Sequence, residues 1–164
     1  MRKWISKMLS MKTLFRYCLK WCFDFKKFDF LKDSSLLMLR LFSGYFMAIN
    51  HGFSKITSTQ EKWISLGEKG MSIFGFDSGF IVFGFLAALS ESLLSLFICL
   101  GILTRPSSLM VSLTMFFAGS YHLGKGDSPE SAFLYMSIFI FIFINGPGKF
   151  SIDQFLLDKS IIKI

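Results

Sequence analysis

Long apolar runs alternate with short polar segments along most of the chain. Four runs fit the roughly 17–25 residues that a membrane-spanning helix needs, and they cover about residues 34–56, 79–103, 106–123 and 131–145. Glu91 is the only charge between Asp77 and Arg105, and the third and fourth runs carry none. Because the apolar residues come in runs rather than stripes, the pattern predicts an all-α integral membrane four-helix bundle.

The segments outside the four runs are amphipathic. In residues 1–33, apolar side chains such as Trp4, Met8, Met11 and Phe15 recur every three or four positions among basic residues, which is typical of a helix lying on anionic lipid. We therefore predict a basic N-terminal tail at the membrane surface over 1–33, a four-span domain over 34–153 and a short amphipathic tail over 154–164.

Two capping boxes are predicted in the connections. Ser58 and Glu61 would start a short helix between the first two spans, and Ser151 and Gln154 would start the C-terminal one. Pro106 suits the first turn of the third span, where a missing backbone donor costs nothing.

The distribution of basic residues predicts the orientation. With four spans, thirteen Lys and Arg share one side, namely nine in residues 1–33, Arg105 and three after Gly148, against four on the other side. Cytoplasmic loops are enriched in Lys and Arg, so both termini are predicted to be cytoplasmic in a bacterial plasma (inner) membrane.

Composition narrows the class of protein. The 164 residues are 52% hydrophobic and only 18% charged, whereas a soluble domain carries about a quarter charged residues. The net charge of +7 follows mostly from topology, and no basic face of a soluble fold suggests nucleic-acid binding. Cys18 and Cys22 have neither the spacing of a redox pair nor that of a zinc site.

The first span carries polar residues on one face. At 100° per residue, Arg40, Gly44, Met47, His51 and Lys55 fall within an arc of about 80°. Charged side chains in a membrane span usually face the bundle interior. Lys55 near the outer end is interpreted as an interfacial anchor, and Arg40 either belongs to the interior or snorkels to the cytoplasmic surface.

The second span offers a matching stripe of small residues around Glu91. At about 1.5 Å per residue, Arg40, Glu91 and His51 lie at depths of about 9, 18 and 25 Å from the cytoplasmic end. Glu91 therefore lies near mid-bilayer, either as a structural lock that is protonated or paired with Arg40, or as a functional carboxylate. His122, near the outer end of the third span, is a functional or an interfacial histidine.

These residues, in this order, resemble the DoxX family of small four-helix bacterial membrane proteins. The resemblance rests on LRLFSGYFMAINHGFSKI, FLAALSESLLSLFICLGILTR, His122 and GPGKFSID, and it covers about residues 34–153. The family pattern falls on Arg40, Gly44, His51, Gly52, Lys55, Glu91, Gly101, Thr104, Arg105, His122, Gly146, Gly148 and Asp153.

The resemblance implies a membrane oxidoreductase component. Members are usually labelled membrane oxidoreductases through a relationship to a subunit of thiosulfate:quinone oxidoreductase. The leading hypothesis is thus a quinone-interacting subunit with a redox partner protein, in which Arg40, His51, Glu91 and His122 line a cleft. His51 and Glu91 would hydrogen-bond the quinone, while Arg40 holds Glu91 ionised.

Other functions stay open at this point. Haem ligation by the two histidines has no supporting signature, and no metal site is predicted. The alternatives to the quinone hypothesis are a non-catalytic accessory or assembly subunit with a structural polar network, and a small proton-coupled transporter. The lipid bilayer is an expected partner, and a homo-oligomer remains an open alternative.

Overall fold

The structure is a computed structural model that describes Thr13, Arg16 and residues 29–159. The described residues contain helices and no strand, so the all-α prediction is confirmed for them. The predicted helix of the N-terminal tail and the last five residues of the C-terminal tail lie outside the described residues. The chain divides into two units, Met1–Asp33 and Ser34–Ile164, and the site lies within the second.

The first predicted span forms one continuous helix with a change of winding inside it. α2 (Asp29–Phe46) continues into a π-helical segment, η2 (Met47–Gly52), and then into α3 (Phe53–Ile56). The residues at both junctions, Phe46 and Gly52, keep right-handed helical dihedral angles. The helix therefore begins five residues before the predicted start at residue 34 and ends at the predicted residue 56.

The second span has the same construction. α5 (Phe80–Leu89) leads into the π-helical segment η4 (Ser90–Leu94) and then α6 (Ser95–Leu100). The helix ends before the predicted residue 103, because Gly101 has a φ of 71° and the Ile102 amide donates back to the Phe97 carbonyl. A left-handed glycine of this kind is a common helix terminator.

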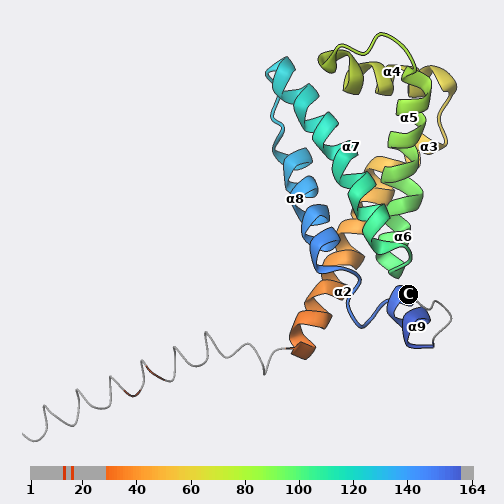
Figure 1. The fold of residues 1–164 in the computed structure, drawn as a ribbon. Helices are drawn as coiled ribbons and strands as arrows, with labels where there is room; N and C mark the ends of the chain where they lie inside the picture. Colours follow the sequence, from red (N-terminus) through yellow and green to blue (C-terminus); the bar gives the residue numbers. More distant parts are fainter. Residues whose placement is uncertain (1–12, 14–15, 17–28, 160–164) are drawn as a thin grey trace, which may run out of the picture. The chain divides into compact units, whose positions relative to one another are not determined.

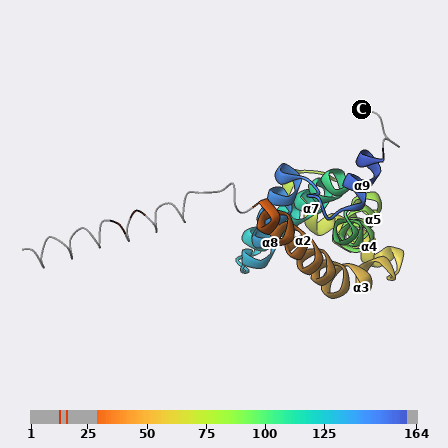
Figure 2. The ribbon, with the colours of Figure 1, turned by 90° about the horizontal axis from the view of Figure 1, so that it is seen from below.

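Two further long helices follow and pack side by side, α7 (Thr104–Lys125) and α8 (Glu130–Asn145). They match the predicted runs 106–123 and 131–145 within two residues at each end, and Pro106 lies in the first turn of α7 as predicted. Gly146, with a φ of 79°, ends α8. Figures 1 and 2 show α7 and α8 beside the two π-containing helices.

Short helices occupy the connections. α4 (Gln60–Met71) and the 3-10 turn η3 (Ser72–Phe74) join the first two long helices, and α9 (Ile152–Asp158) follows α8. Ser151 caps α9 as predicted, since its Oγ accepts from the Gln154 amide at 3.1 Å. The capping box at Ser58 is wrong, because its hydroxyl donates to the Lys55 carbonyl at 2.6 Å and Thr59 takes the cap position without a side-chain bond.

The helices pack around a small apolar core, and glycine allows the closest approaches. The core contains Met47, Ile98, Val111, Met115, Phe139 and Ile142. η2 and η4 pack against each other, and a Cβ on Gly52 would overlap the Glu91 carbonyl. Small residues of this kind bring membrane helices together, as the sequence predicted for this pair of spans.

The described helices differ in how well they meet membrane-span criteria. Phe80–Leu100 is the one helix among the described residues that is both long and apolar enough to cross a membrane, with a mean hydropathy of 2.1 over 21 residues. Glu130–Asn145 is apolar but shorter.

Candidate functional site

A cavity of about 540 Å³ lies between α5 and α7. Figure 1 shows these helices diverging toward the end that carries α4, and α4 with the following turn closes the wedge between them. The cavity is lined by Lys55, Leu66, Gly67, Lys69, Gly70, Met71, Phe76, Phe83, Leu86, Ala87, Glu91, Met110, Leu113, Thr114, Phe117, Ala118, Tyr121 and His122. Most of this lining is apolar, as in most small-molecule sites.

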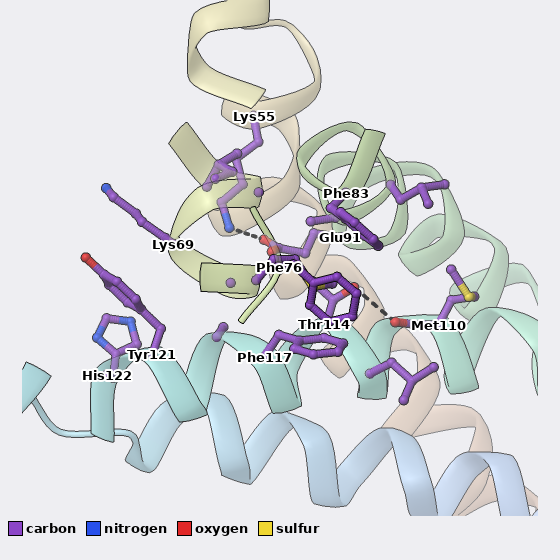
Figure 3. A pocket seen from close by; sticks show the side chains of 18 residues that line it. Lys55, Lys69, Phe76, Phe83, Glu91, Met110, Thr114, Phe117, Tyr121 and His122 are labelled. Carbon is purple, nitrogen blue, oxygen red and sulfur yellow. Dashed lines mark hydrogen bonds and ion pairs between the residues drawn. The ribbon is translucent and has the colours of Figure 1, made fainter. Parts of the chain in front are cut away.

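An ion pair lies in the middle of the lining. Lys55 Nζ is 2.5 Å from Glu91 Oε2, and the side chains are 25% and 2% exposed, respectively (Figure 3). The carboxylate is therefore buried, while the ammonium reaches it from a half-buried position. Desolvating two charges is costly, and only a close partner offsets that cost.

Both partners of this pair are placed by the π-helical segments. Glu91 lies in η4, where it is buried together with Ser90 and Ser92. Lys55 lies in α3, one turn beyond the end of η2, and its carbonyl accepts from Trp63 Nε1 at 2.8 Å. π-bulges occur often at functional sites, and here two of them pack against each other beside the cavity.

Hydroxyl groups extend the polar part of the cavity wall. Thr114 of α7 lines the cavity, and its Oγ1 is 2.7 Å from Ser90 Oγ, so one of the two hydroxyls donates to the other. Ser90 also accepts at its carbonyl from Ser95 Oγ at 3.1 Å. The polar wall thus combines an ammonium, a carboxylate and a hydroxyl.

Aromatic rings form much of the remaining wall. Phe76 and Phe83 lie with ring centroids 5.8 Å apart, and Phe117 packs edge-to-face on Phe74 at 5.1 Å. Figure 3 shows Phe76, Phe83 and Phe117 next to Glu91 and Thr114. Flat apolar walls beside a few polar groups suit a planar ring with polar substituents.

A second set of polar side chains lies at one side of the cavity, apart from the Lys55–Glu91 ion pair. Figure 3 shows Lys69, Tyr121 and His122 together on this side. His122 Nδ1 is 3.7 Å from Asp127 Oδ2, and both side chains are exposed, at 45% and 65%. Lys125 Nζ lies 5.8 Å from the centre of the Tyr121 ring. His122 is therefore at the rim, as the sequence placed it.

The structure separates His51 from the cavity. Its side chain is exposed, and its ring lies 5.8 Å from that of Tyr135 on α8. The physical reason is η2, because π-helical winding places more residues in each turn than the assumed α-helix. Within this segment Met47, Ala48 and Gly52 are buried, so His51 leaves the predicted face.

Arg40 also lies elsewhere, at the other end of the helices. It is 0% exposed, so it does not snorkel, and its Nη2 donates to the Phe150 carbonyl at 2.5 Å. Arg40 therefore hydrogen-bonds to the segment before α9 and not to Glu91. The expected Arg40–Glu91 pair is therefore replaced in the structure by Lys55–Glu91.

Asp153 completes the polar cluster around Arg40. Its carboxylate accepts from the backbone amides of Leu103 and Thr104 at 2.8 Å each and from Thr104 Oγ1 at 2.7 Å. Its own amide donates to the Gly101 carbonyl at 2.8 Å. This carboxylate caps the N-terminus of α7, where negative charge is favourable, and ties the C-terminal segment to the turn between α6 and α7.

The thirteen residues of the family pattern therefore fall mainly into two clusters. Gly52, Lys55, Glu91 and His122 are at or beside the cavity. Arg40, Gly101, Thr104 and Asp153 form the other cluster, which we call the C-terminal latch. Sequence reasoning recognised Lys55 only as an anchor and missed Thr114 and the aromatic wall; the signal for Lys55 was its place on the polar arc.

The described residues contain no group of three His, Cys, Asp or Glu side chains that could hold a metal ion. His122 lines the cavity and His51 does not, so the two imidazoles do not share this site.

Comparison with known proteins identifies one family. The family model described as DoxX matches residues 35–123, which is more than half of the chain and includes Lys55, Glu91, Thr114 and His122. No curated protein matches the chain, and no solved structure matches it.

Proposed function

The chain belongs to the DoxX family of proteins, and from this premise we propose that it is a quinone-binding membrane protein that works with a redox partner. It would cross the bacterial plasma membrane four times with both termini in the cytoplasm. The asymmetry of thirteen basic residues against four supports this orientation. The length of α2, η2 and α3, from Asp29 to Ile56, supports a first span.

The observation that carries the quinone proposal is the buried Lys55–Glu91 pair in an apolar cavity wall. A bound quinone would supply reversible electron and proton uptake. Its ring would lie against the Phe76, Phe83 and Phe117 side chains that line the cavity, and the volume of about 540 Å³ is large enough for a ring with part of a tail.

The polar residues have separate roles in this proposal. The Lys55 ammonium would donate a hydrogen bond to a ligand carbonyl, and the Glu91 carboxylate would accept a proton. The Thr114 hydroxyl on the same wall donates to the Met110 carbonyl at 3.0 Å, so toward a ligand it would act as an acceptor. His122 and Tyr121 at the rim would exchange protons with water. Of the four residues that the sequence hypothesis placed in a cleft, this proposal keeps Glu91 and His122.

The test is the quinone content of the full-length protein purified in mild detergent. We expect the wild type to carry or bind quinone, and we expect Lys55→Met and Glu91→Gln to reduce that content at least about tenfold, because losing one or two hydrogen bonds to a buried ligand costs at least about 1.4 kcal/mol. His51→Ala is the matched control, since His51 lies outside the cavity lining and should leave quinone content unchanged.

The same experiment decides between this proposal and an accessory role. If the wild type neither contains nor takes up quinone, and Lys55→Met and Glu91→Gln only lower the melting temperature, the polar pair is structural. The C-terminal latch favours some structural use of buried polar groups in this chain, because it joins Arg40 and Asp153 to backbone groups rather than to a cavity.

A further inference from the structure

The end of the molecule that carries the C-terminal latch exposes a set of large apolar side chains. Ile152, Phe155 and Leu157 of α9 are 39%, 54% and 39% exposed. Leu100, the last residue of α6, and Leu103, in the turn after it, are 55% and 58% exposed. We call Leu100, Leu103, Ile152 and Phe155 the α9 surface, since Leu157 projects about 160° away from Phe155.

The α9 surface is held in place firmly. Ser151 caps the N-terminus of α9, and Asp153 of α9 accepts from the backbone amide of Thr104 in α7. Just before α9, the Phe150 carbonyl accepts from Arg40. A helix with so many anchoring bonds keeps its exposed face in a fixed position. The exposure therefore belongs to the fold rather than to a loosely attached terminus.

Leu103 adds an independent observation. It has a φ of 45° and is the one non-glycine residue with positive φ in the part of the chain that the structure describes. Left-handed backbone disfavours a residue with a Cβ, and glycine would be the usual choice. The chain instead keeps a large apolar side chain here and exposes it, which is understandable if that side chain has an apolar environment to enter.

The surroundings of the α9 surface match the headgroup region of a bilayer. Leu100 is the last residue of the apolar helix Phe80–Leu100, so the surface continues the flank of a span. Arg105, Lys149 and Lys159 are exposed around it, and Lys159 Nζ lies 4.3 Å from the centre of the Phe155 ring. An apolar body with a cation at its edge is typical of residues at a membrane interface.

The polar side chains of α9 project in a different direction from Ile152 and Phe155. At 100° per residue, Gln154 and Asp158 share one flank, and their side chains are joined at 2.9 Å. Phe155 and Ile152 lie on the other flank, with Lys159 between them. At the same spacing, the polar pair Gln154 and Asp158 and the apolar pair Ile152 and Phe155 lie on adjacent flanks of α9, about 110° apart.

We infer that the α9 surface is an interfacial anchor that inserts into the leaflet at this end of the protein, with anionic phospholipid as its partner. The inference rests on the membrane topology proposed above, though not on quinone binding. Apolar burial supplies part of the attraction, and the basic residues supply a part that requires negative headgroups. The anchor would hold the C-terminal latch, and hence the ends of α2, α6 and α7, at the membrane surface.

The test uses spin labels on the full-length protein in lipid nanodiscs. In a background with Cys18→Ser, Cys22→Ser and Cys99→Ala, single cysteines replace Phe155 or, on the polar flank, Asp158. Collisions with oxygen report lipid and those with a water-soluble nickel chelate report water. We expect oxygen to dominate at Phe155 and nickel at Asp158, with the Phe155 preference lost when phosphatidylglycerol is omitted from phosphatidylcholine discs.

Labels at two further positions, Ile152 and Leu96, serve as controls. Ile152→Cys repeats the measurement with Phe155 intact, in case the label itself detaches the helix. Leu96→Cys, an exposed position inside the apolar helix, reports whether the span is in lipid at all. If Leu96 meets oxygen while the Phe155 and Ile152 labels meet water, the anchor is disproved and the topology survives.

Each of the remaining outcomes would overturn one part of the inference. Labels at Phe155 and Ile152 that are shielded from both reagents would show that another protein covers the surface, which overturns the lipid partner. A lipid signal that is the same with and without phosphatidylglycerol overturns the anionic requirement. Nickel access at Leu96 would instead overturn the proposed membrane placement on which the inference rests.

Discussion

Glu91 is the residue whose environment constrains the site most strongly. Its side chain is 2% exposed, and the carboxylate has Lys55 as its ion-pair partner. Lys55 is 25% exposed, so the two residues connect a buried position with a more accessible one. A buried charge is tolerated only with an oppositely charged partner close by. Lys55 is therefore as important as Glu91, both for folding and for binding any ligand.

Removing Lys55 alone should destabilise the protein. Lys55→Met leaves the Glu91 charge buried without its partner, and breaking a buried pair in this way typically costs about 3–5 kcal/mol. Adding Glu91→Gln to the same chain removes the uncompensated charge and should restore much of that loss. Thermal unfolding of the detergent-solubilised variants measures both effects.

A matched control for the ion pair is Lys69→Met. Lys69 also lines the cavity but is exposed at its rim, so this variant should melt within about 0.5 kcal/mol of the wild type. If Lys55→Met and Lys69→Met behave alike, the Lys55–Glu91 pair contributes no net stability.

At the scale of elements, glycine determines how closely the two π-containing helices approach. A Cβ on Gly52 would overlap the backbone carbonyl of Glu91, and neither backbone can move without shifting a helix. Gly52→Ala should therefore destabilise the protein by about 1–3 kcal/mol, the usual cost of overpacking. It should also lower quinone content, because it displaces Glu91 from the cavity wall.

Gly124 provides the comparison within another helix. The nearest atom to a Cβ there is Ile73 Cδ1 at 3.7 Å, and alanine is a better helix former than glycine. Gly124→Ala should leave the melting temperature unchanged or raise it slightly. Equal melting temperatures for Gly52→Ala and Gly124→Ala would mean that η2 and η4 do not pack as closely as described.

The C-terminal latch makes its own prediction. Asp153→Asn removes the charge that caps α7 and accepts three hydrogen bonds, and losing such a cap costs about 0.5–2 kcal/mol. The segment after α8 should then open more often, so trypsin should cleave the backbone after the exposed Lys149 faster. Limited proteolysis with product masses measures this, and Asp158→Asn on the exposed flank of α9 should leave the cleavage rate unchanged.

Apolar run length and turn chemistry predicted the helices well, and they predicted the site only in part. Runs bounded by charges or by Gly and Pro located the four long helices, and burial of Glu91 followed from its depth. The pairing of Glu91 with Lys55 did not follow, because Lys55 lay on the predicted polar arc but was interpreted as an anchor at its outer end. The exposure of His51 did not follow either, because a uniform 100° per residue cannot represent the π-helical winding of η2. The position of Arg40 depended on a long-range contact with Phe150, which no local pattern contains.

At the scale of the whole chain, the polar residues have two different uses. Around the cavity, Lys55 and Glu91 face a volume that a ligand can enter. In the C-terminal latch, Arg40 and Asp153 bond to backbone groups that join the chain's last helix to the long helices. The DoxX match ends at residue 123, so it contains the complete polar wall of the cavity but only part of the latch.

The proposed topology predicts which loops can be labelled from outside intact cells. In the cysteine-free background, Ser128→Cys lies in the turn between α7 and α8, and Asp158→Cys lies in α9. A membrane-impermeant maleimide should label Ser128→Cys in intact cells and Asp158→Cys only after permeabilisation, because basic residues concentrate on the side of the termini. Labelling of both positions from outside would show an even number of spans between them, which would remove α8 as a span. Labelling of Asp158→Cys alone would show that the orientation is opposite to the proposed one, with the rim residues Tyr121 and His122 on the cytoplasmic side.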